Sequence, residues 1–316
     1  MSCKVEELND DVLRLLCVDG LGARTFNTLV RRSGGLELAA QSALSGEVFP
    51  WLPNGAWELL KKRMERIQID ACRWSADAVD ASIVTVMDDD FPQLLCPLPS
   101  CPAMLWYQGN IHSVHQAGVA IVGARRCTAY GIEQTNNFSA HFASSELCII
   151  SGGARGIDAA AHRSALRCAG KTAAVLGSGL SVVYPPEHDA LFKAIVSEGG
   201  IVLSEFPCNR PPQPAYFPRR NRIVSGLSSA VLVVEAAKRS GALITARIAV
   251  EEHGRQAYAI PGRIGDGASA GCLQAIHDGW LELALDPSII CDESQQAWHR
   301  LSSVKEEDFN TFEELQ

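Results

Sequence analysis

The sequence predicts an α/β protein in which a doubly wound, mostly parallel sheet follows a small helical domain. From residue 117 onward, short apolar runs alternate with helical patterns of about a dozen residues, as in strands joined by crossover helices. The first 80 residues carry short amphipathic helical patterns instead. The longest apolar runs, such as Ala230–Val234, are far too short to span a bilayer, so no membrane partner is expected, and the scattered cysteines favour a cytoplasmic protein.

The helical domain is expected over residues 1–80. Residues 5–34 read as two helices around a turn at Gly20–Gly22. In a helix-hairpin-helix (SAM-like) module such a turn offers backbone N–H groups to a DNA phosphate, whereas in a plain helical bundle the turn merely requires glycine. The second interpretation is the simpler one. Residues 56–74 predict one further helix with a solvated face of mixed charge.

The larger domain is expected over residues 81–286. It opens with a β-branched run at 82–87 and a Pro-rich connection to a short strand at 104–107. Six buried strands are expected to follow, at 118–122, 148–151, 172–176, 200–204, 230–235 and 256–260. Ligands bind at the carboxyl ends of such strands, so the glycine-rich turns that follow them are predicted to line one edge of the sheet.

Acidity is concentrated at the end of the chain. The net charge is −8, of which residues 287–316, expected to form an acidic tail, carry −5 and residues 81–286 only −1. Binding of a polyanion therefore depends on where the arginines lie, not on net charge. The eleven cysteines are scattered without a CxxC pair, which indicates reduced thiols rather than a disulfide framework or a zinc site.

Two glycine turns have the chemistry of anion sites. Gly152, Gly153 and Gly156 surround Arg155 in a strand-to-helix turn whose amides and helix N-terminus favour an anion. Arg125 follows the preceding strand and adds a guanidinium at the same edge. Neither GxGxxG nor GxxxxGK[ST] is present, which weakens a dinucleotide site and excludes a P-loop. Close backbone packing is the alternative explanation for each turn.

The most concentrated positive charge is the hexamer Phe217–Arg222. Between Phe206 and Gly226 there are four arginines and no acidic residue. Guanidinium groups beside an aromatic ring suit a single-stranded nucleic acid, because the cations take phosphates and the ring takes a base face. A solvated helix start after a proline is the alternative interpretation.

Candidate catalytic groups are few, and none is assigned. Asp158 can pair with Arg155 or cap the helix, and Glu205 and Glu235 read best as buried acids that orient an arginine. The histidines lack metal-ligand spacing, so no metal or cofactor is expected.

The motifs occur in the order seen in the DNA-processing protein A family (DprA, also called Smf), which residues 85–285 closely resemble. They are Gly123–Arg126 with Tyr130-Gly131, Ser151–Asp158, Ala174–Leu180, Tyr184-Pro185, Ser204–Pro207, Phe217–Ile223, Glu235-Ala236, Ser240-Gly241 with Thr245, and Pro261-Gly262.

The resemblance implies an extended Rossmann-like domain that binds single-stranded DNA without sequence preference. It also implies a homodimer without enzymatic activity that protects incoming DNA in natural transformation and helps to load the RecA recombinase. The DNA-binding residues implied by the family motifs are Arg125, Gly152, Gly153, Arg155, Gly156, Phe217, Arg219, Asn221 and Arg222. We expect phosphates to be held by Arg125, the glycine turn, Arg219 and Arg222, and Asn221 to bind a base edge or to hold the loop.

The sequence also departs from the family pattern. Trp280 replaces a small residue after Asp278-Gly279, and residues 211–216 lack the basic residue that often precedes the phenylalanine. The winged-helix domain with which many members end is not expected in residues 287–316. Whether the acidic tail is free or covers the basic groove stays open.

Two rival functions remain. A related Rossmann group, the nucleoside-monophosphate phosphoribohydrolases, uses a glycine turn followed by Thr and Glu, and Ser240-Gly241, Thr245 and Glu251 are faintly similar to it. Their Pro-Gly-Gly-x-Gly-Thr motif is absent. The second rival is a sensor that binds a mononucleotide tightly and an oligonucleotide weakly.

Overall fold

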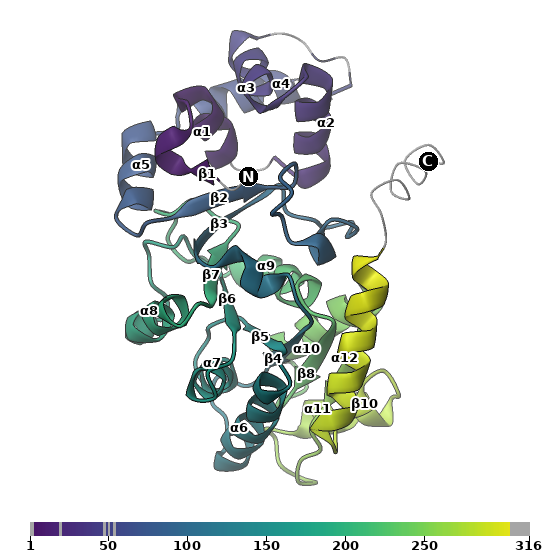
Figure 1. Ribbon diagram of the computed structural model, residues 1–316. Coiled ribbons are helices and arrows are strands. Elements are labelled where there is room, and N and C mark those ends of the chain that lie inside the picture. The colour runs from purple at the N-terminus through teal and green to yellow at the C-terminus, as the bar shows by residue number, and fades with distance from the viewer. Residues whose placement is uncertain (1–2, 19–20, 47–48, 50, 53–54, 304–316) are drawn as a thin grey trace.

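A computed structural model describes residues 3–18, 21–46, 49, 51–52 and 55–303. Its centre is a ten-stranded sheet with the strand order β1-β2-β3-β7-β6-β5-β4-β8-β9-β10 (Figure 1). The run β7-β6-β5-β4-β8-β9-β10 is parallel throughout. In contrast, β3 pairs with β7, β2 with β3 and β1 with β2 in antiparallel fashion. The predicted mostly parallel sheet is confirmed.

The eight predicted strands, β2 to β9, lie close to their expected positions, whereas the two edge strands, β1 and β10, were not predicted. The strands are β1 (Cys3–Lys4), β2 (Ser82–Thr85), β3 (Met104–Gly109), β4 (Gly118–Val122), β5 (Cys148–Ser151), β6 (Thr172–Leu176), β7 (Ile201–Ser204), β8 (Ala230–Val233), β9 (Gln256–Ala259) and β10 (Glu282–Leu283).

The chain reverses direction across the sheet between β4 and β8. It runs from β4 outward through β5 and β6 to β7, then returns to β8 on the other side of β4 and continues to β9 and β10. In a doubly wound sheet this switch point, at the carboxyl ends of the strands, leaves a crevice.

Helices cover both faces of the sheet. One face carries α6 (Ala129–Ser144), α7 (Ile157–Arg167), α8 (Asp189–Ser197) and α12 (Pro287–Ser302). The other carries α9 (Tyr216–Gly226), α10 (Gly241–Arg247) with its π-helical continuation Ile248–Glu252, and α11 (Ala270–His277). Alternate residues of β4 point into the two layers, Val119 and Ile121 toward the first and Ala120 and Val122 toward the second.

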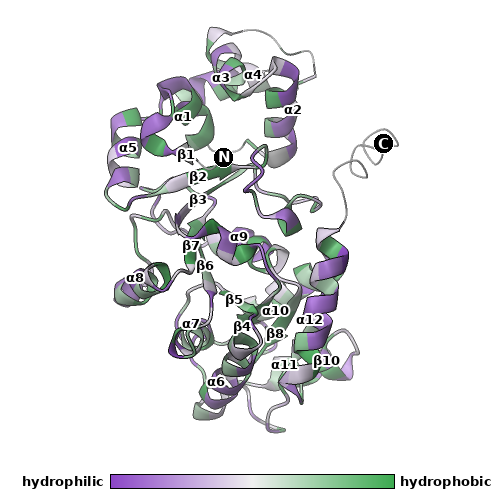
Figure 2. Cartoon of the chain, in the orientation of Figure 1, coloured by the Kyte–Doolittle hydropathy of each residue, from purple (hydrophilic) through white to green (hydrophobic). Residues whose placement is uncertain are grey.

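Hydropathy follows this layering. In Figure 2 the central strands are mostly green, whereas the covering helices carry both purple and green residues. Such amphipathic helices bury one stripe against the sheet and leave the other in water.

Between β1 and β2 the described residues form five α-helices, at the top of Figure 1: α1 (Asp10–Cys17), α2 (Ala23–Ser33), α3 (Leu36–Ser45), α4 (Ala56–Glu65) and α5 (Ile69–Asp77). Gly22 caps α2, but Gly20 of the predicted turn lies outside the described residues. These helices share one buried cluster with β2, β3 and α8. The division at residue 80 therefore stays a prediction.

The predicted single helix over 56–74 is wrong. It breaks between Glu65 and Ile69. Arg14 of α1 donates hydrogen bonds from Nη1 to the carbonyls of Met64, at 3.2 Å, and Ile67, at 2.8 Å. These bonds tie the end of α4 and the residues that follow it to α1, so the break is stabilised from 50 residues away.

The first part of the predicted acidic tail, residues 287–302, is a packed helix. Residues 287–302 form α12, which Asp286 caps by accepting a hydrogen bond from Ser288 N at 2.8 Å. Ile290 and Cys291 are buried in the layer that contains α6. Residues 304–316 lie outside the described residues. No helix in the described ranges is long and apolar enough to cross a membrane.

Candidate nucleic-acid interface

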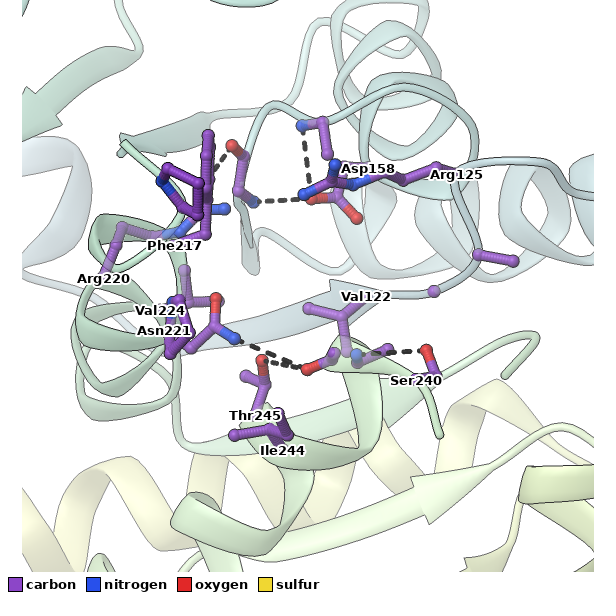
Figure 3. Close-up of a pocket in the computed structure, with 18 of the residues that line it drawn as sticks. Val122, Arg125, Asp158, Phe217, Arg220, Asn221, Val224, Ser240, Ile244 and Thr245 are labelled. Carbon is purple, nitrogen blue, oxygen red and sulfur yellow. Dashed lines mark hydrogen bonds between the residues drawn. The ribbon is translucent and has the colours of Figure 1, made fainter. Parts of the chain in front are cut away.

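A cavity of about 590 Å³ opens at the switch point of the sheet. One wall is α9, and the other consists of the loops after β4 and β5 and the start of α10 (Figure 3). The sequence predicts a ligand edge at this place, and Arg125, Gly152, Phe217 and Asn221 are among the predicted residues that line the cavity.

Helix α9 presents one face to this cavity. Phe217, Arg220, Asn221 and Val224 line it, at the spacing i, i+3, i+4 and i+7 that one helical face requires. Figure 3 shows these four side chains together on α9, across from Ser240, Ile244 and Thr245.

Arg219 and Arg222 lie outside the lining of the cavity. Both bind Glu205, Arg219 through Nε at 2.9 Å and Arg222 through Nη2. The interpretation of Glu205 as an acid that orients arginine is thereby confirmed. Arg219 is also held 5.3 Å from the ring centroid of Phe206. The Glu205 carboxylate therefore neutralises part of the positive charge of Arg219 and Arg222.

Arg220 is the functional candidate that the sequence analysis missed. Its side chain is 95% buried at the cavity and donates Nη1 to the carbonyl oxygens of Gly152 and Val175. Burial lowers the pKa of Arg220 to about 10, and the nearby Asp158 carboxylate opposes this shift. The sequence signal for Arg220 was its position three residues after Phe217, which places both side chains on one face of a helix.

Asp158 occupies two amides of the glycine turn. Gly152 N and Ala154 N donate to its Oδ2 at 3.2 and 3.3 Å. Burial raises the pKa of Asp158, while Arg220 and these amides lower it. The turn therefore already holds an internal anion, so at least part of its anion-binding capacity is satisfied within the chain.

The glycines themselves permit close packing. A Cβ at Gly152 would lie 2.3 Å from the Arg220 guanidinium. At Gly156, where φ is +77°, it would lie 2.3 Å from the carbonyl oxygen of Ala124. Gly153, with φ of +65°, packs against the ring of Phe192. The alternative explanation in the sequence analysis, close backbone approach, therefore holds for this turn.

Arg155 points away from the predicted partner. It is exposed and donates Nη2 to Glu187 Oε2 at 3.0 Å, so the predicted pairing of Arg155 with Asp158 is wrong. Arg155 is not part of the cavity lining.

Arg125 and Phe217 contact each other in the lining of the cavity. The Arg125 guanidinium lies 5.4 Å from the Phe217 ring centroid, within the range of a cation–π contact. The Tyr184 ring packs against Phe217 with a centroid separation of 5.6 Å and an interplanar angle of 48°. Arg125 is exposed and makes no ion pair with any residue that the structure describes. The site thus combines an ordered aromatic ring with an available cation.

The α10 wall is polar. Asn221 Nδ2 donates to the carbonyl oxygen of Gly241 at 3.4 Å, and Ser240 Oγ accepts from Ala242 N at 3.2 Å. Of the two roles considered for Asn221, the contact with Gly241 fits that of holding the loop.

The carboxylates are placed unfavourably for hydrolysis. Glu251 lies outside the cavity lining and binds Arg247 at 3.0 Å. Glu235 accepts a hydrogen bond from Thr128 N at 2.9 Å, so the interpretation that it orients an arginine is wrong. Asp158 is the one carboxylate among the lining residues. No group of three potential metal ligands occurs in the described ranges.

Comparison with known proteins decides the family. The model of the DNA recombination-mediator protein A family matches residues 82–295. The chain belongs to this family. Within it, the chain is 42% identical to protein Smf of Escherichia coli over 70% of its own length and 59% of the relative's. It is 46% identical to protein Smf of Synechocystis over 62% and 50% of the two lengths, and 41% identical to DprA of Streptococcus pneumoniae over 68% and 76%. The chain thus spans between half and two thirds of the two Smf proteins.

Two solved structures support the family and the fold. DprA of S. pneumoniae superposes with a TM-score of 0.74 at 31% identity, over 90% of this chain and 98% of that one. DprA of Helicobacter pylori, whose structure concerns its single-stranded DNA binding mode, superposes with a TM-score of 0.60 at 26% identity, over 66% and 94%.

Proposed function

We propose that the cavity at the switch point binds single-stranded DNA without sequence preference. The observation that carries the proposal is the cation–π contact of Arg125 with Phe217 in the lining of the cavity. The free guanidinium takes a phosphate, and the ring offers a base face. The described binding of single-stranded DNA by the H. pylori relative supports this assignment.

Arg125 acts directly in this proposal, whereas Arg220 acts through the loop. Arg220 fixes the carbonyls of Gly152 and Val175 and adds positive potential at the cavity. Arg219 and Arg222 contribute at longer range, because Glu205 neutralises part of their charge. Arg155, paired with Glu187, contributes in the same weak manner.

The wider role rests on family membership. We propose that the protein, as a cytoplasmic homodimer, protects incoming DNA in natural transformation and promotes loading of RecA. In this role it works without a cofactor and without catalysis.

Fluorescence anisotropy of a labelled dT oligomer tests the proposal at two salt concentrations. We expect salt-sensitive binding that Arg125→Ala largely abolishes, because phosphate contacts release counterions. Arg126→Ala is the matched control, since Arg126 is an exposed neighbour outside the cavity lining. Affinity that does not depend on salt would contradict the proposal, and equal affinity for duplex DNA would contradict the stacking role of Phe217. Release of free base from AMP would favour the phosphoribohydrolase alternative.

A further inference from the structure

A second cavity lies on the other side of α10 from the first. It has a volume of about 340 Å³ and lies between α10 and α11. Ser240 and Ile244 line both cavities, so the two are separated only by the segment that begins α10. Figure 3 shows these two side chains at the α10 wall of the first cavity.

The second cavity is rich in positive charge. Lys238, Arg239 and Arg247 line it together with a single carboxylate, Asp278, which accepts a hydrogen bond from Gln274 at 2.8 Å. Lys238 and Arg239 are exposed, and neither makes an ion pair with any part of the chain that the structure describes. Two cations are thus available to an anionic ligand.

Arg247 packs against an aromatic ring. Its guanidinium carbon lies 4.6 Å from the ring centroid of Trp280, whose indole packs against the buried cluster beneath α10. Glu251 binds the Nη1 atom of the same guanidinium at 3.0 Å. An ordered guanidinium plane is a surface on which a nucleobase stacks, and its order reduces the entropy lost on binding.

We propose that the second cavity binds the continuation of the single DNA strand that occupies the first. This inference rests on the proposed function of the first cavity. Beyond Ser240 the strand passes over the start of α10, its phosphates meet Lys238 and Arg239, and one base stacks on Arg247. Trp280 is a positioning residue that acts through Arg247.

The combination of groups favours a nucleic-acid strand over an acidic peptide. An acidic peptide would use the two available cations, Lys238 and Arg239, but would gain nothing from a guanidinium plane backed by indole. A strand that enters the first cavity also reaches the second without a new binding event, since the shared residues make the path continuous. The added contacts therefore raise affinity as intramolecular ones.

The test is the dependence of affinity on oligomer length. Binding of dT oligomers of about 3 to about 15 nucleotides, a range close to the site sizes of single-strand binding modules, is measured by competition. We compare the wild type with Arg247→Ala, Arg247→Lys and Trp280→Leu. Arg263→Ala is the matched control, because Arg263 is exposed and lines neither cavity.

We expect the affinity for the shortest oligomers to be unchanged in all four variants. For the longest oligomers, Arg247→Ala and Trp280→Leu should each lose at least about fivefold, the lower limit for loss of one stacking contact. Arg247→Lys keeps the charge but not the plane and should lose nearly as much as Arg247→Ala. Unchanged affinity for the shortest oligomers also shows that each variant is folded.

Equal affinities of Arg247→Ala and wild type for the longest oligomers would overturn the inference, as would wild-type affinity of Arg247→Lys. A loss that is the same at every length would also overturn it. These outcomes leave the proposed function intact as long as Arg125→Ala abolishes binding at all lengths. Absence of binding by the wild type would refute the proposed function itself.

Discussion

Replacing Arg220 by methionine should destabilise the fold strongly at neutral pH. The substitution keeps most of the side-chain volume but removes the buried cation beside Asp158 and the donor to two carbonyls. Each buried carbonyl left without its donor costs about 1–3 kcal/mol, and the Asp158 carboxylate, which keeps its two amide donors, also loses a nearby opposite charge. We therefore expect about 4 kcal/mol, a large part of a typical total stability of about 5–15 kcal/mol.

The stability lost in Arg220→Met should decrease as the pH falls, because the loss acts through the Asp158 carboxylate. Burial already raises the pKa of this carboxyl, and Arg220 is the largest influence that lowers it. Without Arg220 the folded-state pKa rises further above that of the unfolded chain. The folded variant then binds a proton more readily than the unfolded chain as the pH falls, so it regains stability relative to the wild type.

Urea unfolding at pH 7.5 and 5.5, followed by circular dichroism, measures both effects. Asp158→Asn provides the control background, in which Arg220→Met should cost less and lose most of its pH dependence. Strictly additive effects of the two substitutions, or a cost of Arg220→Met below about 1 kcal/mol, would refute the assigned coupling.

Three further predictions concern the ring, the turn and a buried histidine. Phe217→Leu should weaken binding of dT oligomers by about 1–3 kcal/mol in anisotropy measurements while leaving the salt dependence unchanged; a reduced salt slope would count against a stacking role. Gly156→Ala should lower the stability measured in urea by at least about 1 kcal/mol, because φ is +77° and the new Cβ would meet Ala124 O at 2.3 Å. Gly241→Ala, where a Cβ meets nothing within 4 Å, is its control and should be nearly neutral. Burial lowers the pKa of His162 to about 3, so the unfolded chain binds a proton near pH 6.5 while the folded chain does not. This group should therefore cost about 2 kcal/mol of stability between pH 7.5 and 5, and His162→Gln should remove that part of the pH dependence in urea unfolding.

The parallel strands could be predicted because each is a short apolar run that ends in a turn. Val119–Val122, for example, is buried on both faces, and no polar residue interrupts it. The antiparallel addition of β3 next to β7 could not be predicted in this way, since strand direction depends on the path of the whole chain. The break between α4 and α5 likewise depends on Arg14, which is distant in the sequence.

The candidate site was predicted in position but not in detail. Because Arg219, Arg220 and Arg222 lie within four residues of one another in the sequence, they were interpreted as one cluster. On a helix, successive residues are rotated by about 100°, so neighbours in sequence point in different directions. Only Arg220 shares the face of Phe217, and it is the arginine that the sequence analysis left out. A helical projection of 216–226 would have found it.

The acidity of the chain is compatible with a DNA site because of where α12 packs. Its carboxylates at Asp292 and Glu293 belong to a helix on the α6 face, whereas α9 and α10 form the cavity on the other face. Because the sheet lies between the two helical layers, their separation exceeds the Debye length of about 8 Å at physiological salt, and much of the repulsion is screened. Residues 287–302 therefore do not cover the cavity, and local cations determine its potential. For this reason charge removed at Arg125 should affect DNA binding far more than charge removed from α12.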